Sequence, residues 1–216
     1  MEQINDVIKK YAKLAAAYQP SGGMRIFVRH QGRLYGTRMG ADFDNLKESD
    51  IRDVTDLYFP GKPVLQQKND INALLYFKTP YLGWYLDRGI DINASLDDMA
   101  QIVGPTVTTV PLRDKEIGDA LKKAAVVMVR NRSAIASGRS LYEAYTAMTV
   151  IEKSAEVGLK ASVLGGAEKL SRFDARLMEC VMLLVVFLIA TEAFFRYFYK
   201  FTTFIGMKFG KNKKSK

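Results

Sequence analysis

The stretch NALLYFKTPY, residues 72–81, decides the fold because a strand pattern in it gives way to the start of a helix. Residues 72–75 predict a strand that enters a core, and 79–81 predict a helix start, since proline is favoured in the first helical turn. Tyr76 and Lys78 lie between these two parts. Because successive strand residues alternate between faces, both side chains are expected to point the same way. This polar pair at the end of an apolar strand is a candidate functional position.

The residues on either side predict a mixture of helices and strands. Apolar residues at helical or alternating spacing, with glycine and proline breaks between them, set the boundaries. Helices are expected at 8–18, 80–87, 96–104, 115–123 and 141–164. Strands are expected in a hairpin at 24–37 that turns at Gln31-Gly32, in a strand and loop at 54–65, and at 106–112 and 124–131. Because these elements do not alternate strictly, we expect an α/β fold with a mixed central sheet flanked by helices.

The composition excludes several kinds of site. The 216 residues suit one domain with a sizeable core. The single cysteine, Cys180, allows neither an intrachain disulfide nor a cysteine-rich zinc cluster. The single histidine, His30, allows no two-histidine metal site within one chain, although a symmetric oligomer could pool one histidine per subunit.

The net charge of +9 is placed unevenly along the chain. No acidic residue follows Glu192, whereas seven basic residues do, which leaves +2 for residues 1–192. The body of the protein is therefore close to neutral, and the basic character belongs to its tail. A nucleic-acid-binding protein would spread lysine and arginine over a face of the fold, so nucleic acid is not expected as a partner.

The C-terminal residues differ in kind from the rest. We divide the chain into an α/β domain at 1–170, an apolar and aromatic helical segment at 171–207 and a basic tail at 208–216. Residues 177–195 approach the roughly 20 apolar residues that a spanning helix needs, but they contain Glu179 and Glu192. A helix that spans the membrane, one that lies in its interface and one buried between subunits all remain open.

Aromatic and basic side chains follow this helix, and such residues suit the headgroup layer and anionic lipid. We therefore expect membrane association with the body on the cytoplasmic side, and a soluble cytoplasmic protein is the alternative. The expected lipid contacts are Phe187, Phe194, Phe195, Arg196, Tyr197, Tyr199, Lys200, Lys208, Lys211, Lys213 and Lys214.

Five stretches, in the right order, resemble the class II aldolase/adducin family. They are SGG at 21–23, LYGTRMGADFDNLKESDI at 34–51, DINALLYFKTPY at 70–81, AQIVGPTVTTVPL at 100–112 and the segment 126–161 that begins VVMVRN. Together they cover roughly residues 5–170. The resemblance implies a class II aldolase/adducin-like central sheet flanked by helices, here followed by a C-terminal hydrophobic helix. It also implies a homo-oligomer, commonly a tetramer.

The resemblance implies a zinc site that this chain does not keep. Enzymes of the family hold zinc between three histidines and use it to stabilise an enediolate. The matching positions are Tyr76, Lys78 and Arg132, the last directly after Asn131. A phenol, an ammonium and a guanidinium do not make a zinc site, and two of them carry the charge that a metal would repel. We expect neither a metal nor another cofactor.

Other family motifs are also incomplete. The family's Ser-Ser-Glu segment, which carries its catalytic glutamate, has no counterpart, because residues 64–72 are expected to enter the strand directly. Gly23 stands at the asparagine of the Ser-Gly-Asn motif, and Thr37-Arg38-Met39-Gly40 keeps only its first and last residues from Thr-Pro-Ser-Gly. The sequence therefore predicts a pseudoenzyme that serves as an oligomeric structural or scaffolding protein, with its protein partner unknown.

Three readings remain for the altered pocket. Lys78 and Arg132 could bind an anionic metabolite in place of the metal, with Arg25, Thr37, Arg38 and Gly40 as further contacts. The same cations could instead form a structural network with carboxylates, since buried charges are normally paired. A metal-independent lyase that uses Lys78 as a Schiff-base nucleophile is the third reading.

Overall fold

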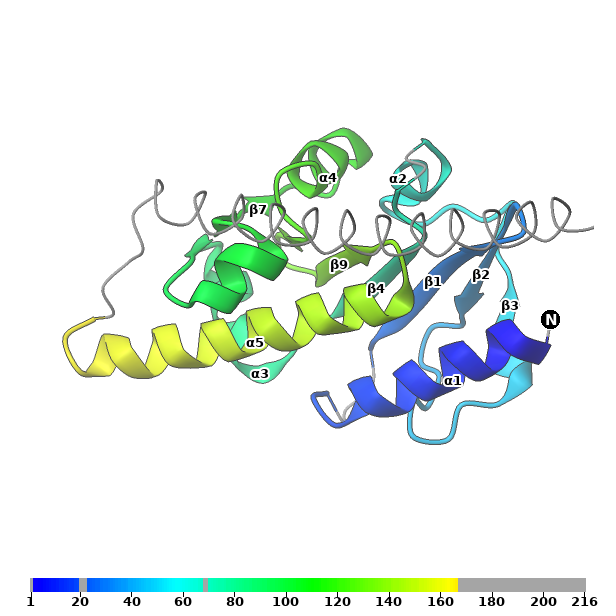
Figure 1. The fold of residues 1–216 in the computed structure, drawn as a ribbon, viewed down its shortest axis with the longest axis horizontal. Coiled ribbons are helices and arrows are strands. Elements are labelled where there is room, and N and C mark those ends of the chain that lie inside the picture. Colours follow the sequence, from blue (N-terminus) through cyan, green and yellow to red (C-terminus); the bar gives the residue numbers. More distant parts are fainter. Residues whose placement is uncertain (1, 20–22, 68–69, 167–216) are drawn as a thin grey trace, which may run out of the picture.

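The structure is a computed structural model, and it describes residues 2–19, 23–67 and 70–166 (Figure 1). A central sheet runs in the order β3-β2-β1-β4-β9-β8-β7. Neighbouring strands are antiparallel except β7 and β8, which are parallel, so the expected mixed sheet is confirmed. The strands are β1 Arg25–His30, β2 Arg33–Thr37, β3 Ile51–Asp53, β4 Ala73–Phe77, β7 Thr109–Val110, β8 Val126–Val129 and β9 Ala134–Gly138.

Helices cover both faces of this sheet. Figure 1 shows α1 and α5 on one side and α2 and α4 on the other. The α-helices are α1 Glu2–Ala16, α2 Lys62–Gln67, α3 Pro80–Arg88, α4 Asp114–Leu121 and α5 Leu141–Val163. The smaller elements are the 3-10 helix Glu48–Asp50, the π-helix Met99–Val103 and the strand pair β5 Ile92–Asn93 and β6 Thr106–Val107.

The alternation of β4 supplies two separate hydrophobic cores. Leu75 and Phe77 point to the face covered by α1, α3 and α5, and they belong to the larger core. Leu74 and Tyr76 point to the opposite face and pack with residues of α2 and α4 in the smaller core. Every residue of β4 is buried, because helices lie on both sides of it.

A buried carboxylate fixes the junction between β4 and α3. Glu152, on α5, accepts hydrogen bonds from Thr79 Oγ1 (2.5 Å), from the Tyr81 amide (3.0 Å) and from the Leu82 amide (2.9 Å). The last two donors are amides of the first turn of α3, which have no partner within the helix, and a negative charge is favoured at that end. Glu152 therefore ties α5 to the point where the chain leaves the central strand.

Most of the predicted elements are present. The hairpin turns where expected, and Gln31 and Gly32 both have positive φ values, 48° and 78°, as a two-residue hairpin turn of this kind requires. The buried strand within 124–131 is β8, and the long C-terminal helix of the domain ends before Gly165, as predicted.

Three predictions of elements were wrong. No strand forms within 54–65: the residues before Lys62 form turns and a bend, and Pro63 lies in the first turn of α2, where its fixed φ suits a helix. Residues 64–67 belong to α2, so the segment 64–72 does not enter the strand directly. The segment 106–112 forms two short strands, β6 and β7, in different sheets.

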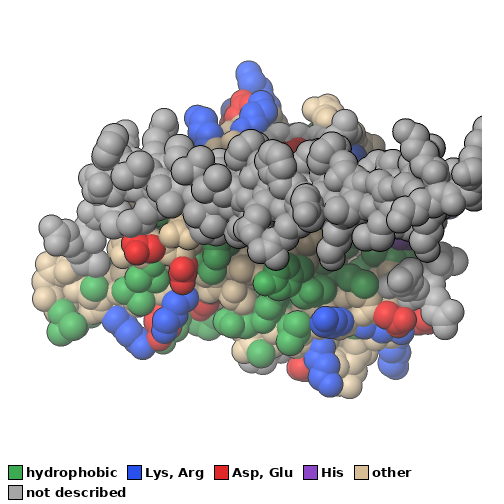
Figure 2. Space-filling view, in the orientation of Figure 1, with side chains coloured by type: hydrophobic (Ala, Val, Ile, Leu, Met, Phe, Trp, Pro, Cys, Tyr) green, Lys and Arg blue, Asp and Glu red, His purple; other side chains and the backbone are tan. Residues whose placement is uncertain are grey.

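The remaining C-terminal predictions lie outside the described residues. They are the helical segment at 171–207 with its lipid contacts and the basic tail at 208–216. Among the helices that the structure describes, none is both long and apolar enough to cross a membrane. Figure 2 shows hydrophobic and charged side chains interspersed on the face formed by α1 and α5.

Candidate functional site

A cavity of about 550 Å³ opens on the face of the sheet that α2 and α4 cover. It lies at the strand positions that the sequence singled out. Its lining residues are Gly23, Arg25, Met39, Pro60, Tyr76, Leu112, Val129, Arg130, Asn131, Arg132, Ser133 and Ile135. Cavities of this size are typical of small-molecule sites.

The floor of the cavity is a row of side chains across three strands. Arg25 of β1 is the register partner of Tyr76 in β4, and Tyr76 is in turn the partner of Ile135 in β9. Residues opposite each other on neighbouring strands share a face. The pairing of β1 with β4 therefore places an arginine directly beside the tyrosine that stands where the resemblance implies a zinc ligand.

Tyr76 has a structural contact that occupies its hydroxyl group. The side chain is buried, and its hydroxyl donates a hydrogen bond to the Pro60 carbonyl oxygen. Burial raises the pKa of Tyr76 above its usual value, and this effect outweighs the opposing positive charge of Arg25. The phenol therefore stays neutral, with its proton committed to a backbone carbonyl, and is suited neither to binding a metal nor to acting as a base.

Arg25 is half-buried and has no carboxylate partner among the described residues. Its guanidinium carbon lies 4.5 Å from the centroid of the Phe27 ring, and its buried Nε atom has no hydrogen-bond partner there. Burial lowers the pKa of Arg25; the neighbouring Tyr76 opposes this effect, and Arg52 adds to it. An arginine nevertheless remains charged at neutral pH.

Arg132 reaches the cavity from the tight turn between β8 and β9. The Val129 amide donates to the Ser133 carbonyl oxygen and the Arg132 amide donates to the Val129 carbonyl oxygen, both at 3.0 Å. Asn131 takes a φ of 56°, a conformation that asparagine tolerates better than most residues. Arg132 is exposed, and it lines the cavity together with Arg130 and Arg25.

The structure does not bring Lys78 to this cavity. Its ammonium lies 2.5 Å from Asp87 Oδ1 on α3, and its side chain is 40% exposed. Strand β4 ends at Phe77, so the alternation that would align Lys78 with Tyr76 does not continue into the turn toward α3. This exposed ion pair differs from the dry pocket that Schiff-base chemistry needs.

The remaining predicted contacts lie in or near the loop between β2 and β3. Arg38 forms a hydrogen-bonded ion pair with Asp50, and the buried Thr37 accepts a hydrogen bond from the Ile26 amide at 3.0 Å. Gly40 is exposed with a φ of 72°, and no neighbouring atom lies near the position of a side chain. Met39, which the sequence did not single out, is the residue of this loop that lines the cavity.

The three-histidine zinc site that the resemblance implies does not fit these residues. The Tyr76 hydroxyl is used by Pro60, Lys78 is paired with Asp87, and Arg132 brings a positive charge. Within residues 2–19, 23–67 and 70–166, no three His, Cys, Asp or Glu side chains come together to hold a metal ion. Helix α2, whose residues are KPVLQQ, contributes no carboxylate before β4.

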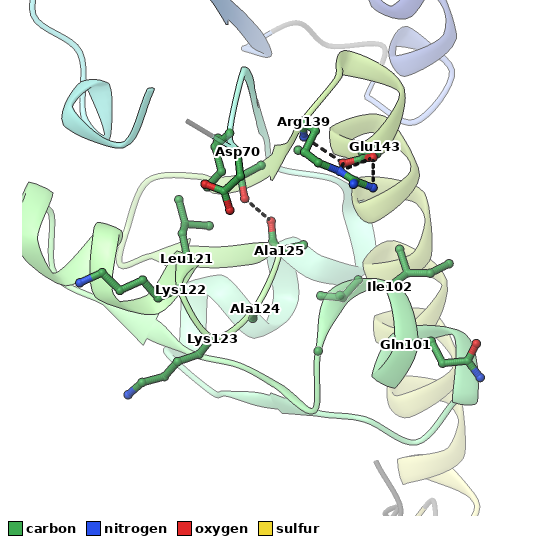
Figure 3. Close-up of a pocket in the computed structure, with 15 residues that line it drawn as sticks. Asp70, Gln101, Ile102, Leu121, Lys122, Lys123, Ala124, Ala125, Arg139 and Glu143 are labelled. Atoms are coloured by element: carbon green, nitrogen blue, oxygen red, sulfur yellow. Dashed lines mark hydrogen bonds and ion pairs between the residues drawn. The ribbon is translucent and has the colours of Figure 1, made fainter. Parts of the chain in front are cut away.

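A second cavity, of about 440 Å³, makes a useful contrast (Figure 3). Two of its cations have carboxylate partners nearby: Arg139 pairs with Glu143 at 2.8 Å, and Lys122 pairs with Asp119 at 2.5 Å. Lys122 and Lys123 extend outward from it in the view of Figure 3. The cavity between Arg25 and Arg132 is therefore the better candidate site, because its charges are not balanced in this way.

Comparisons with known proteins agree with this architecture. The family profile described as "Class II Aldolase and Adducin N-terminal domain" matches residues 9–159. No curated protein gives a significant match.

Solved structures of several aldolases are similar in fold. An L-fuculose 1-phosphate aldolase has a TM-score of 0.72 at 21% identity, over 82% of this chain and 96% of that one. The L-fuculose-1-phosphate aldolase of Thermus thermophilus has a TM-score of 0.63 at 17% identity, over 79% of this chain and 100% of that one. The enzyme of the same name from Glaciozyma antarctica has a TM-score of 0.65 at 13% identity, over 81% and 78%. At these identities the likeness concerns the fold alone.

Proposed function

The chain belongs to the class II aldolase and adducin family, and we propose that it is a non-catalytic member that serves as an oligomeric structural or scaffolding protein. Its enzyme relatives named above act on a sugar phosphate, as their names state. A fold alone does not carry an activity, so the proposal depends on the residues of the cavity.

One observation carries the proposal. At the position where the family resemblance places a zinc ligand, the Tyr76 hydroxyl is buried and donates its hydrogen bond to the Pro60 carbonyl oxygen. A zinc ligand must offer a lone pair at low cost, and a neutral phenol whose burial raises its pKa does not. The cations at Arg25 and Arg132 disfavour a divalent metal further.

The proposed assembly is a homo-oligomer, a tetramer by resemblance, that associates with membranes through residues 171–216. Several copies of a weakly binding segment on one particle bind far more tightly than one copy, because each binding event raises the effective concentration of the others. Phe187 and Tyr197 supply aromatic groups, and Lys208 to Lys214 supply positive charge for anionic lipid.

The test of the non-catalytic proposal is an aldol-cleavage assay with L-fuculose 1-phosphate in the presence of zinc. We expect no turnover above the rate without protein. Zinc-dependent cleavage that disappears in Tyr76→Phe would contradict the proposal, because it would make Tyr76 part of an active site.

The test of the assembly compares the full chain with a chain that ends at Gly166. We expect the full chain to float with anionic vesicles and the shorter chain to remain at the bottom of the gradient, with light scattering giving the size of each particle. Equal flotation of both chains would contradict a C-terminal membrane contact. A monomer in both cases would contradict the oligomer.

A further inference from the structure

The cations near the cavity fall into two groups. Lys78 and Arg38 form ion pairs with Asp87 and Asp50, so their charges are balanced within the chain. Arg25 and Arg132 form no ion pair with any carboxylate in the described parts of the chain. The difference indicates that Arg25 and Arg132 are available to pair with an anionic group outside the described residues.

The surroundings of Arg25 hold its side chain in one place. Its guanidinium lies over Phe27, and the Phe27 ring is stacked on Phe59 with a centroid distance of 3.8 Å. Both rings are buried, so the platform beneath the guanidinium is rigid. A partly buried charge without a partner is unfavourable, and an anion that pairs with it would recover this free energy. Because the residue is only half-buried and lines the cavity, its outer nitrogens remain accessible to a ligand.

The lining of the cavity defines the chemistry of that ligand. Three arginines and no aspartate or glutamate are among its described lining residues, so the cavity favours a ligand with more than one negative charge. Met39, Pro60, Leu112, Val129 and Ile135 supply apolar walls that would contact carbon atoms. Guanidinium groups suit planar carboxylates and phosphates, because their N–H groups donate two parallel hydrogen bonds.

We propose that this cavity binds a small soluble organic dianion, of the phosphate monoester or dicarboxylate class, between Arg25 at its floor and Arg132 at its rim. The two charges of the ligand neutralise the two guanidinium groups, and its carbon atoms lie against the apolar walls. The proposal goes beyond the scaffolding role and does not depend on membrane association or on the number of subunits. A binding measurement therefore tests it separately from the assays above.

The test is calorimetric titration of the full chain at constant ionic strength with glycerol 3-phosphate and with succinate, and with glycerol as the neutral control. We expect saturable binding of at least one dianion with a dissociation constant on the order of 1 mM or lower, and no binding of glycerol. Arg25→Gln and Arg132→Gln should each weaken binding about tenfold or more, since each removes a charge-assisted hydrogen-bonding group. Arg25→Lys should weaken it less than Arg25→Gln.

Arg33→Gln is the matched control, because Arg33 lies at the hairpin, is exposed and pairs with Asp53. It should leave the dissociation constant unchanged. If Arg25→Gln fails to fold, the exposed Arg132→Gln variant still decides the question. The proposal is overturned if neither dianion binds saturably below about 10 mM, or if the Arg132 variant binds as tightly as the unaltered chain.

Discussion

The two faces of the central sheet differ in how they treat polar groups. On the face covered by α1, α3 and α5, the buried carboxylate of Glu152 accepts three hydrogen bonds and joins three elements. On the other face, the buried Nε of Arg25 has no hydrogen-bond partner among the described residues. The buried carboxylate of the first face is satisfied within the chain, whereas the half-buried guanidinium of the second face lines the candidate cavity. The comparison indicates that polar groups on the first face stabilise the fold. A ligand site is to be sought on the second face.

Strand β4 belongs to both faces, so it is the place to test this difference. Phe77 belongs to the larger core, and its neighbour Tyr76 belongs to the smaller core beside the cavity. If the two faces have separate roles, substitutions at adjacent positions of one strand should differ strongly in their effect on stability.

The largest expected effect is that of Phe77→Ala, which removes a fully buried ring from the larger core. We expect a loss of about 4 kcal/mol in the free energy of unfolding, since the remaining side chains do not fill the space. Urea denaturation followed by circular dichroism measures this loss. If the loss were no greater than that of Tyr76→Phe, the expected difference in stability between the two positions would be contradicted.

Glu152→Ala should have the next largest effect. It leaves the Thr79 hydroxyl and the amides of Tyr81 and Leu82 without their acceptor. We expect a loss of about 3 kcal/mol, and Glu152→Gln should recover part of it because the amide oxygen still accepts. Equal losses for the two variants in the same denaturation assay would argue against the hydrogen bonds as the cause.

Tyr76→Phe should cost less, because the ring stays in place and only one hydrogen bond, to the Pro60 carbonyl oxygen, is lost. We expect a loss of about 1 kcal/mol. The variant also sharpens the comparison, since dianion binding should persist if Arg25 and Arg132 hold the ligand. Loss of binding together with unchanged stability would assign the phenol a direct role.

The smallest effect on stability is expected from a substitution of Asp50, which pairs with Arg38. Arg25, by contrast, has no such carboxylate partner among the described residues. The hydrogen bond from Arg38 lowers the pKa of Asp50 in the folded state. The resulting stability is present above the unfolded-state pKa of about 4 and is lost as the pH falls through the lower folded-state value. Asp50→Asn should therefore flatten the acid side of the profile of melting temperature against pH. An unchanged acid slope would show that the pair does not contribute.

Local sequence signals predict most of the fold but only part of the candidate site. The hairpin is recognisable because Gln31-Gly32 suits a turn with positive φ, and β8 because its residues are apolar and β-branched. Strand β9 consists of AIASG, small residues with little strand preference, and it forms because β4 and β8 pair with it on either side. That pairing depends on contacts distant in sequence, which a local pattern does not contain.

In the structure Tyr76 and Arg132 line one cavity, whereas the direction of Lys78 does not follow from alternation. Alternation holds only while the chain is extended, and β4 ends at Phe77. The sequence names Arg25 only as a further contact, because its place beside Tyr76 depends on the pairing of β1 with β4. The register of β1 with β4 places Arg25 beside Tyr76, and this register can be deduced only when the order of the strands in the sheet is known.

The contact of Glu152 also has a structural consequence. About 16 Å of helix follows Glu152 on α5, up to the end at Val163, and the chain continues from there toward residues 171–216. The Glu152 carboxylate joins this helix to Thr79, two residues after β4 ends at Phe77. Strand β4 also carries Tyr76 on the floor of the cavity. One short strand therefore connects the Glu152 contact of α5 to the cavity.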